Sequence, residues 1–259
     1  MSREDLKEFL WEKAAQYEVP DFIPLDPLSI PHRYNQLRDI EVSAFFAATL
    51  AWGQRSTILR SLEDLMARMD HEPGAFVMHH SESDLKAFRG FVHRTFQSED
   101  AEGFVRALAS LYTRHDSLED VFVKHWMQGE DRSQLKESVA GFHREFMACQ
   151  GVALRTKKHV ANPALGSAAK RLNMFLRWMV RPAHRGVDLG LWSRISPSVL
   201  SIPLDVHTSN VGRKLGLLTR TANDWKAVEE LTASLRMIDP EDPIRMDFAL
   251  FGLGAMEGF

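Results

Sequence analysis

Cysteine is almost absent from this sequence, because Cys149 is the only one in 259 residues. A single cysteine excludes an intramolecular disulfide, a cysteine-ligated iron–sulfur cluster and a zinc site built from several cysteines. A run of about 18 apolar residues, which a membrane-spanning helix needs, is also missing. The first residues carry acids where a secretory signal peptide needs an apolar stretch. We therefore expect a soluble, cytoplasmic protein with no membrane contact.

Acidic residues are missing from one long stretch, between Glu145 and Asp188. The whole chain has 32 Lys plus Arg against 35 Asp plus Glu, a formal charge of -3, which taken alone argues against a nucleic-acid binder. The acid-free stretch contains eight basic residues: Arg155, Lys157, Lys158, Lys170, Arg171, Arg177, Arg181 and Arg185. Without these eight, 24 basic residues face 35 acidic ones, a difference of -11. The near-neutral total therefore hides one basic segment in an acidic protein.

Alternation of apolar and polar residues, which predicts exposed strands, does not occur over any useful length, and the periodicity is helical almost throughout. We expect an all-α protein with a first helix from Ser2 to about Glu18, a buried helix at Ile40–Trp52 and another that Ser56 caps. Further helices are expected at Ser98–Arg114, Leu118–Met127, Ser133–Cys149, Ser167–Arg181, Val206–Leu218, Asn223–Met237 and Pro243–Leu253.

The sequence contains no internal repeat and no low-complexity linker, which predicts a single compact unit over residues 1–259. Within it we expect a central helical lobe at 36–185, which includes the basic helix. Residues 1–35 and 186–259 would form the second lobe.

The helix expected at Ser167–Arg181 has two dissimilar faces. Its apolar stripe consists of Leu172, Phe175, Leu176 and Met179, and its opposite face of Lys170, Asn173, Arg177 and Arg181. A polar face of this kind is usually solvated, but surface helices commonly interleave Glu with Lys, and this one has no acid. A polyanionic partner would explain the difference. Lys170 lies in the first turn, where the helix dipole and Arg171 disfavour its protonated form and so favour a nucleophilic amine.

A second candidate site begins at Asp205, which follows Pro203 and precedes the helix expected at Val206–Leu218. This position makes Asp205 a strong candidate for the helix N-cap. A carboxylate fixed there stays ionised, so it can also stabilise a cationic transition state or orient a water molecule. Arg213 and Lys214 add positive charge further along the same helix.

Two segments resemble the helix-hairpin-helix (HhH-GPD) DNA glycosylase superfamily. Pro203–Leu217, PLDVHTSNVGRKLGL, is similar to the segment in which that superfamily places an aspartate before a helix. Phe45–Arg55, FFAATLAWGQR, is similar to its buried helix with a glutamine-containing turn, which would place Gln54 near DNA. Over nearly its full length the chain also resembles a bacterial family of uncharacterised proteins.

The resemblance implies roles for two of these residues. In lyase-type members a lysine at the start of the helix before the aspartate attacks the sugar, and Lys170 falls there. The interval of 35 residues from Lys170 to Asp205 looks more like the archaeal 8-oxoguanine glycosylases than the bacterial endonuclease branch. The hairpin itself departs from the superfamily's Leu-Pro-Gly-Val-Gly, because Asn162–Lys170, NPALGSAAK, has one glycine. We therefore expect a degenerate hairpin.

The implied protein is a two-lobed, all-α glycosylase of base-excision repair that removes a damaged base, such as an oxidised purine, flipped out of duplex DNA. Lys170 and Asp205 would be catalytic, the first as a Schiff-base nucleophile at the sugar C1′ and the second in assisting departure of the base. The residues expected to contact DNA are Gln54, Arg171, Arg177, Arg181, His207, Arg213 and Lys214. Such an enzyme would be associated with the nucleoid.

No cofactor and no partner protein are implied. Eleven histidines favour a metal site only weakly, because adjacent residues such as His79 and His80 point in different directions on a helix and no His-x-x-x-His pair occurs. Two other functions stay open. The first is a non-catalytic nucleic-acid-binding protein that keeps the glycosylase fold. The second is a helical domain whose basic helix docks an acidic protein.

Overall fold

The computed structural model describes residues 2–259, and their regular structure is helical. The exception is a short antiparallel pair, β1 (Val92–His93) with β2 (Phe96–Gln97), in which His93 lies opposite Phe96. The prediction of an all-α protein is therefore confirmed. Within the described residues, no helix combines the length and the apolar character that crossing a bilayer requires.

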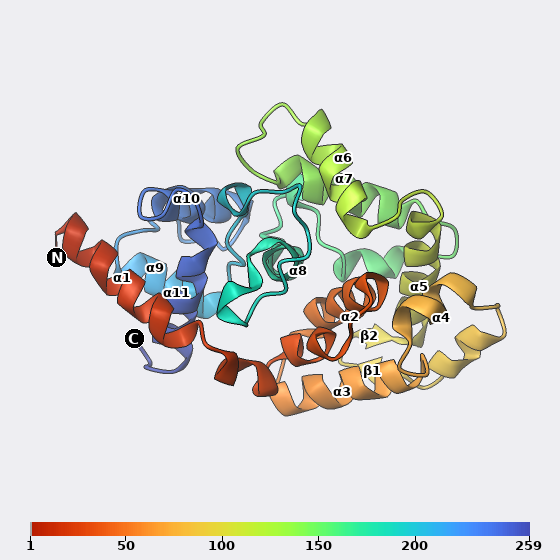
Figure 1. The fold of residues 1–259 in the computed structure, drawn as a ribbon. Helices are drawn as coiled ribbons and strands as arrows, with labels where there is room; N and C mark the ends of the chain where they lie inside the picture. The colour runs from red at the N-terminus through yellow and green to blue at the C-terminus, as the bar shows by residue number, and fades with distance from the viewer. Residues whose placement is uncertain (1) are drawn as a thin grey trace. The chain divides into compact units, whose positions relative to one another are not determined.

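The contacts divide the chain into two compact units, each with its own core. Unit 1 comprises residues 2–22, Asp131–Leu135 and Pro163–Phe259. Its α-helices are α1 (Arg3–Tyr17), α8 (Lys170–Val180), α9 (Val206–Lys214), α10 (Trp225–Arg236) and α11 (Met246–Ala255). Helix α11 packs against both α1 and α9 (Figure 1).

Unit 2 comprises Ile23–Glu130 and Lys136–Asn162. Its α-helices are α2 (Leu37–Leu50), α3 (Arg55–Ala67), α4 (Pro73–His79), α5 (Ser98–Tyr112), α6 (Leu118–Gln128) and α7 (Lys136–Met147). Short 3-10 turns connect the helices of both units, at Pro20–Leu25, Pro27–Ser29, Pro31–Arg33, Asp84–Phe88, Leu154–Lys158, Pro163–Leu165, Ala183–Arg185, Pro197–Val199 and Pro243–Arg245. The core of this unit is rich in phenylalanine; Phe45 stacks on Phe104 with a centroid distance of 5.3 Å.

The division differs from the expected lobes in the position of the basic helix. We expected α8 in the central lobe at 36–185, but it belongs to unit 1 with α9 and the C-terminal helices. Its apolar stripe packs on residues that follow it in the chain: Phe175 meets Trp192 edge-on at 5.3 Å, and the Trp192 amide donates to the carbonyl of Met179. Helical periodicity identifies the apolar stripe, but it does not show which other segments of the chain pack against it.

Side chains cap the N-termini of α1, α6, α9 and α10, at Ser2, Ser117, Asp205 and Asp224. The expected cap at Ser56 is wrong, because α3 begins at Arg55 and its N-cap is Gln54, which makes no side-chain cap hydrogen bond. The Ser2 hydroxyl accepts from the Asp5 amide at 3.1 Å, and the Asp5 carboxylate accepts from the Ser2 amide at 2.9 Å, a reciprocal capping box. Helix α8 starts later than expected, at Lys170, because Ala169 is left-handed with φ +47°. Ser167 instead forms a bridge with Asp224. Helix α9 ends at Lys214 rather than Leu218, and Gly216 with φ +72° reverses the chain there.

We predict that two buried helical glycines of unit 2 respond oppositely to alanine. A Cβ at Gly141 in α7 would lie 2.1 Å from Cγ of the His125 ring in α6, whereas one at Gly103 in α5 would meet nothing closer than 3.5 Å. Gly141→Ala should lower the free energy of unfolding by about 1–3 kcal/mol. Gly103→Ala should leave it unchanged or raise it by up to about 1 kcal/mol, because alanine favours helix. Urea unfolding measures both, and equal stabilities would contradict the close approach of α6 and α7.

Candidate active site

Lys170 and Asp205 form an ion pair in unit 1. The Lys170 Nζ lies 3.1 Å from Asp205 Oδ2, although 35 residues separate them in the sequence. The lysine side chain is 35% exposed and the aspartate side chain 14% exposed. The two residues that the resemblance names as catalytic are therefore adjacent in space and accessible from solvent.

The carboxylate of Asp205 is held at the start of α9. Its Oδ1 accepts from the Thr208 amide at 2.8 Å, which confirms the predicted N-cap and leaves Oδ2 for Lys170. Asp205 follows the buried segment Ser201–Leu204. In that segment the Ile202 amide donates to the Thr232 hydroxyl of α10 at 3.1 Å. Asp205 is thus fixed by its cap and by the backbone that leads to it.

Lys170 is the first residue of α8 and follows residues 162–169, the segment expected to contain a degenerate hairpin. That segment contains the 3-10 turn Pro163–Leu165 and a loop that begins at Gly166 with φ +86°. The Gly166 carbonyl accepts from the Trp225 amide at 3.0 Å, which ties the loop to α10. A Cβ on Gly166 would meet no atom within 4 Å, so the loop is open to solvent at this point.

Asn173 connects the two halves of the site, a role that its place on the polar helix face did not predict. It is 1% exposed, and its Nδ2 donates to the carbonyls of Ala168 at 3.2 Å and Ile202 at 3.4 Å. One side chain therefore joins the loop before Lys170 to the segment before Asp205. Helical periodicity places Asn173 on the face of Lys170 but reveals neither carbonyl.

The expectation that Arg177 and Arg181 present a basic face to DNA phosphates is wrong. Arg177 is 7% exposed and Arg181 1%. Both belong to what we call the buried ion network of unit 1, which consists of Arg177, Arg181, Arg245, Glu18, Asp188, Asp242 and Asp247. Their charges are neutralised inside the protein, so no polyanionic partner is needed to explain them.

Arg181 lies at the centre of this network. Its Nη2 donates to Glu18 at 2.6 Å and to Asp242 at 2.7 Å, and Nη1 donates to Asp188. Burial alone would lower the pKa of Arg181, but the hydrogen bonds to Asp242 and the charges of Asp188, Asp242 and Glu18 together raise it. The carboxylates that pair with Arg181 therefore come from residues outside the acid-free stretch.

Asp247, near the start of α11, joins the network to the ion pair. Its Oδ2 accepts from Arg177 Nη1 at 2.6 Å, and its Oδ1 lies 3.5 Å from the hydroxyl of Thr208, the residue whose amide caps Asp205. Burial raises the pKa of Asp247 to about 6, with Arg177 opposing and the charge of Asp205 adding to the rise. We did not predict this residue as functional; its signal is one acid in the apolar run Met246–Leu253.

The other residues expected to contact DNA differ in availability. His207 and Lys214 of α9 are exposed, as is Gln54, the N-cap of α3 in unit 2. Arg171 is half-buried, and burial lowers its pKa. Arg213 is engaged internally, because it donates to the carbonyls of Arg220 and Thr221 and to the Asn223 side chain. Arg213 therefore holds the loop after α9, and His207 and Lys214 are the side chains of α9 among these candidates that a phosphate can reach.

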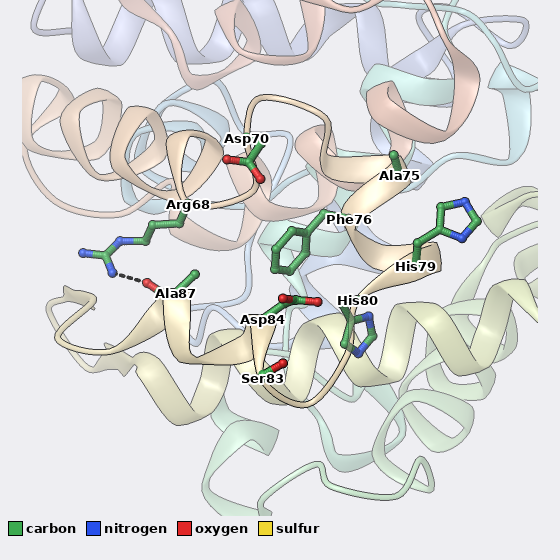
Figure 2. Close-up of a pocket in the computed structure, with 9 residues that line it drawn as sticks. All are labelled: Arg68, Asp70, Ala75, Phe76, His79, His80, Ser83, Asp84 and Ala87. Carbon is green, nitrogen blue, oxygen red and sulfur yellow. Dashed lines mark hydrogen bonds between the residues drawn. The ribbon is translucent and has the colours of Figure 1, made fainter.

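A separate hollow of about 520 Å³ lies in unit 2 and contains none of the predicted site residues. It is lined by the end of α3, by α4 and by the turn at Asp84–Phe88, and Figure 2 shows the Phe76 ring between the carboxylates of Asp70 and Asp84. The rings of His79 and His80 point apart, and His80 Nδ1 contacts the carbonyl of Val77 at 3.0 Å. Over residues 2–259, no three histidine, cysteine or acidic side chains are arranged to hold a common metal ion.

Comparison with known proteins gives one match. The sequence model of a family described as "Protein of unknown function (DUF2400)" matches residues 26–256. No curated protein and no solved structure matches.

The pKa of Asp247 predicts a pH-dependent component of stability. A carboxyl whose pKa rises on folding, here from 3.8 to about 6, stabilises the fold fully below pH 3.8, and this contribution is lost as the pH rises through 6. The component should amount to roughly 3 kcal/mol at most. Wild-type protein should therefore lose more stability between pH 4.5 and 7.5 than Asp247→Asn, as measured by urea unfolding. Asp21→Asn, which removes an exposed carboxylate, serves as the control, and identical pH dependence in wild type and Asp247→Asn would refute the raised pKa.

Proposed function

Because the chain belongs to the DUF2400 family, whose description names no activity, we propose a function from the site itself: a DNA glycosylase with lyase activity. It would remove a damaged base from duplex DNA in base-excision repair. The observation that carries the proposal is the accessible contact of 3.1 Å between Lys170 and Asp205. The resemblance to the helix-hairpin-helix glycosylases supplies the reaction type, and an oxidised purine is the substrate class it favours.

The chemistry assigns each group of the pair a step. An amine attacks only when neutral, so the Lys170 ammonium first gives a proton to a base, and the Asp205 carboxylate is within reach to accept it. The Nζ lone pair then forms a bond to the sugar C1′ while the bond from C1′ to the base breaks. The base leaves with the electron pair of that bond and takes up the proton that Asp205 accepted. The new secondary ammonium at C1′ gives a proton back to Asp205, and the bond from C1′ to the ring oxygen then breaks. The ring oxygen keeps that electron pair and takes up the proton, while the nitrogen lone pair forms the C1′=Nζ Schiff base, which borohydride reduces to a stable amine.

Electrostatics supports Asp205 as the second participant. Positive charge develops on the sugar as the base departs, and a carboxylate already fixed by the Thr208 amide needs no reorganisation to stabilise it. The base must leave the helical stack before C1′ can be reached, because the glycosidic bond is inaccessible in a duplex. The open loop at Gly166 and the exposed His207 and Lys214 are the groups of unit 1 suited to phosphates.

We predict that borohydride traps the protein covalently on duplex DNA containing an oxidised purine. Lys170→Ala should abolish trapping, because it removes the amine that lies 3.1 Å from Asp205. Asp205→Asn should slow trapping by about 10²–10⁴-fold, the usual range for loss of a general base. Lys226→Ala, which removes an exposed lysine of α10, is the matched control and should trap at the wild-type rate. Denaturing electrophoresis of labelled DNA measures all four proteins, and a Lys170→Ala protein that still cross-links would exclude Lys170 as nucleophile.

Non-catalytic binding of nucleic acid is the second candidate, and the single glycine of the hairpin favours it. Its signature is duplex binding that weakens with salt while no base is released from any lesion. Because Arg177 and Arg181 are neutralised internally, their charges do not contribute to the salt dependence in either case. Binding without trapping across a panel of oxidised, alkylated and deaminated bases would select this candidate over the enzyme.

A further inference from the structure

We propose that Asp247 is a positioning residue for the Lys170–Asp205 pair: from the buried side of α9 it holds Thr208 in place, and its charge governs how readily Lys170 gives up a proton. The benefit of this positioning to catalysis rests on the proposed function. The coupling between Asp247 and Lys170 rests on the contacts of Asp247, and it can be tested without DNA.

Three contacts in sequence link Asp247 to the lysine. The Asp247 Oδ1 lies 3.5 Å from the Thr208 hydroxyl, the Thr208 amide donates to Asp205 Oδ1 at 2.8 Å, and Asp205 Oδ2 lies 3.1 Å from Lys170 Nζ. Thr208 is 1% exposed and Asp247 5% exposed, so the inner part of this chain excludes solvent. A shift in the position of Asp247 would therefore move the buried Thr208, and through the Thr208 amide it would move Asp205.

Arg177 fixes Asp247 from the other side. Its Nη1 donates to Asp247 at 2.6 Å, its Nε lies 3.3 Å from Asp188, and its guanidinium lies 4.5 Å from the centre of the Phe248 ring. These contacts hold the planar guanidinium in one orientation. Asp247 consequently has its two oxygens assigned to different neighbours, Oδ2 to Arg177 and Oδ1 to Thr208.

The charges near Asp247 come from α8 and α9. They are the cations Arg177 and Lys170 and the anion Asp205, and each of them influences the proton affinity of the Asp247 carboxyl. Asp188 lies beyond Arg177. Because Asp247 is almost inaccessible to water, its charge is screened less than a surface charge, so an ionised Asp247 adds negative potential at the partly exposed Lys170 and favours the ammonium over the amine. Neutralising Asp247 removes that potential, so Lys170 loses its proton more readily.

A merely structural role for Asp247 would not predict this effect. If the residue served only to satisfy Arg177, its replacement would lower the stability of unit 1 and leave the reactivity of Lys170 in the folded protein unchanged. The reactivity of one lysine as a function of pH therefore separates the two roles.

The test is competitive acetylation of the full-length protein over a pH series, with each lysine quantified by peptide mass spectrometry. In Asp247→Asn the pH midpoint for labelling of Lys170 should fall by about one unit. Lys226, which is exposed on α10 and is not among the charges that act on Asp247, is the internal control and should keep its midpoint. Circular dichroism checks that the variant is folded.

A second pair of variants tests the mechanical link and preserves every charge. Thr208→Val removes the hydroxyl next to Asp247, loosens Asp205 from Lys170 and should lower the same midpoint by a smaller amount, whereas Thr208→Ser should match wild type. If neither Asp247→Asn nor Thr208→Val moves the midpoint of Lys170, the inference is overturned. If the midpoints move as expected but wild-type protein is never trapped on DNA, the coupling stands and the glycosylase proposal fails.

Discussion

The constraint on which unit 1 depends is the burial of two arginines at the C-terminal end of α8, Arg177 in its last turn and Arg181 at its C-cap. Arg177 and Arg181 are almost inaccessible to water, and each needs carboxylates that its own segment does not contain. Glu18 comes from the end of α1 and Asp188 from the chain after α8. Asp242 is the residue before the 3-10 turn Pro243–Arg245, and Asp247 lies in the first turn of α11. Buried charges are tolerated only when paired and hydrogen-bonded, so these distant segments must meet around α8. The network specifies which parts of the chain converge, whatever its net contribution to stability.

This convergence also positions the candidate site. Lys170 begins the helix that carries both arginines, and Asp205 caps the helix that packs on α11. The fixed orientation of α8 therefore sets the position of Nζ, while Asn173 and Thr208 set the carboxylate relative to it. The ion pair is partly exposed where the network behind it is closed. The lysine is thus attached to a rigid, buried set of ion pairs but is itself accessible. This arrangement suits a reactive group that must be held in one position and still contact a large substrate.

Local signals predicted the fold well and the site in part. The helical periodicity, the start of the first helix at Ser2 and the N-cap at Asp205 are properties of short segments, and the structure confirms them. The predictions from the sequence were wrong where the role of a residue depends on pairing with a residue far away in the chain. A helical wheel places Arg177 on a polar face, but nothing within α8 shows that Asp247, 70 residues later, neutralises it. The same limitation hid Asn173 and Asp247, since their roles come from carbonyl and hydroxyl groups of other segments. The meeting of Lys170 and Asp205 followed from resemblance rather than from any pattern of the residues.

The charge balance of the chain consequently has a different meaning. A basic segment within an acidic protein first indicated a surface for a polyanion, yet two of its cations are used to hold unit 1 together. In unit 1 the accessible groups suited to a nucleic acid are Lys170, His207 and Lys214, beside an open backbone loop at Gly166, and in unit 2 Lys157 and Lys158 of the basic segment are exposed. Fewer exposed cations reduce the sequence-independent attraction that dominates non-specific binding. Recognition by this site would then depend on shape and on covalent capture at Lys170 more than on charge. That dependence would suit the proposed activity, in which the protein acts on one flipped nucleotide and not on the surrounding duplex.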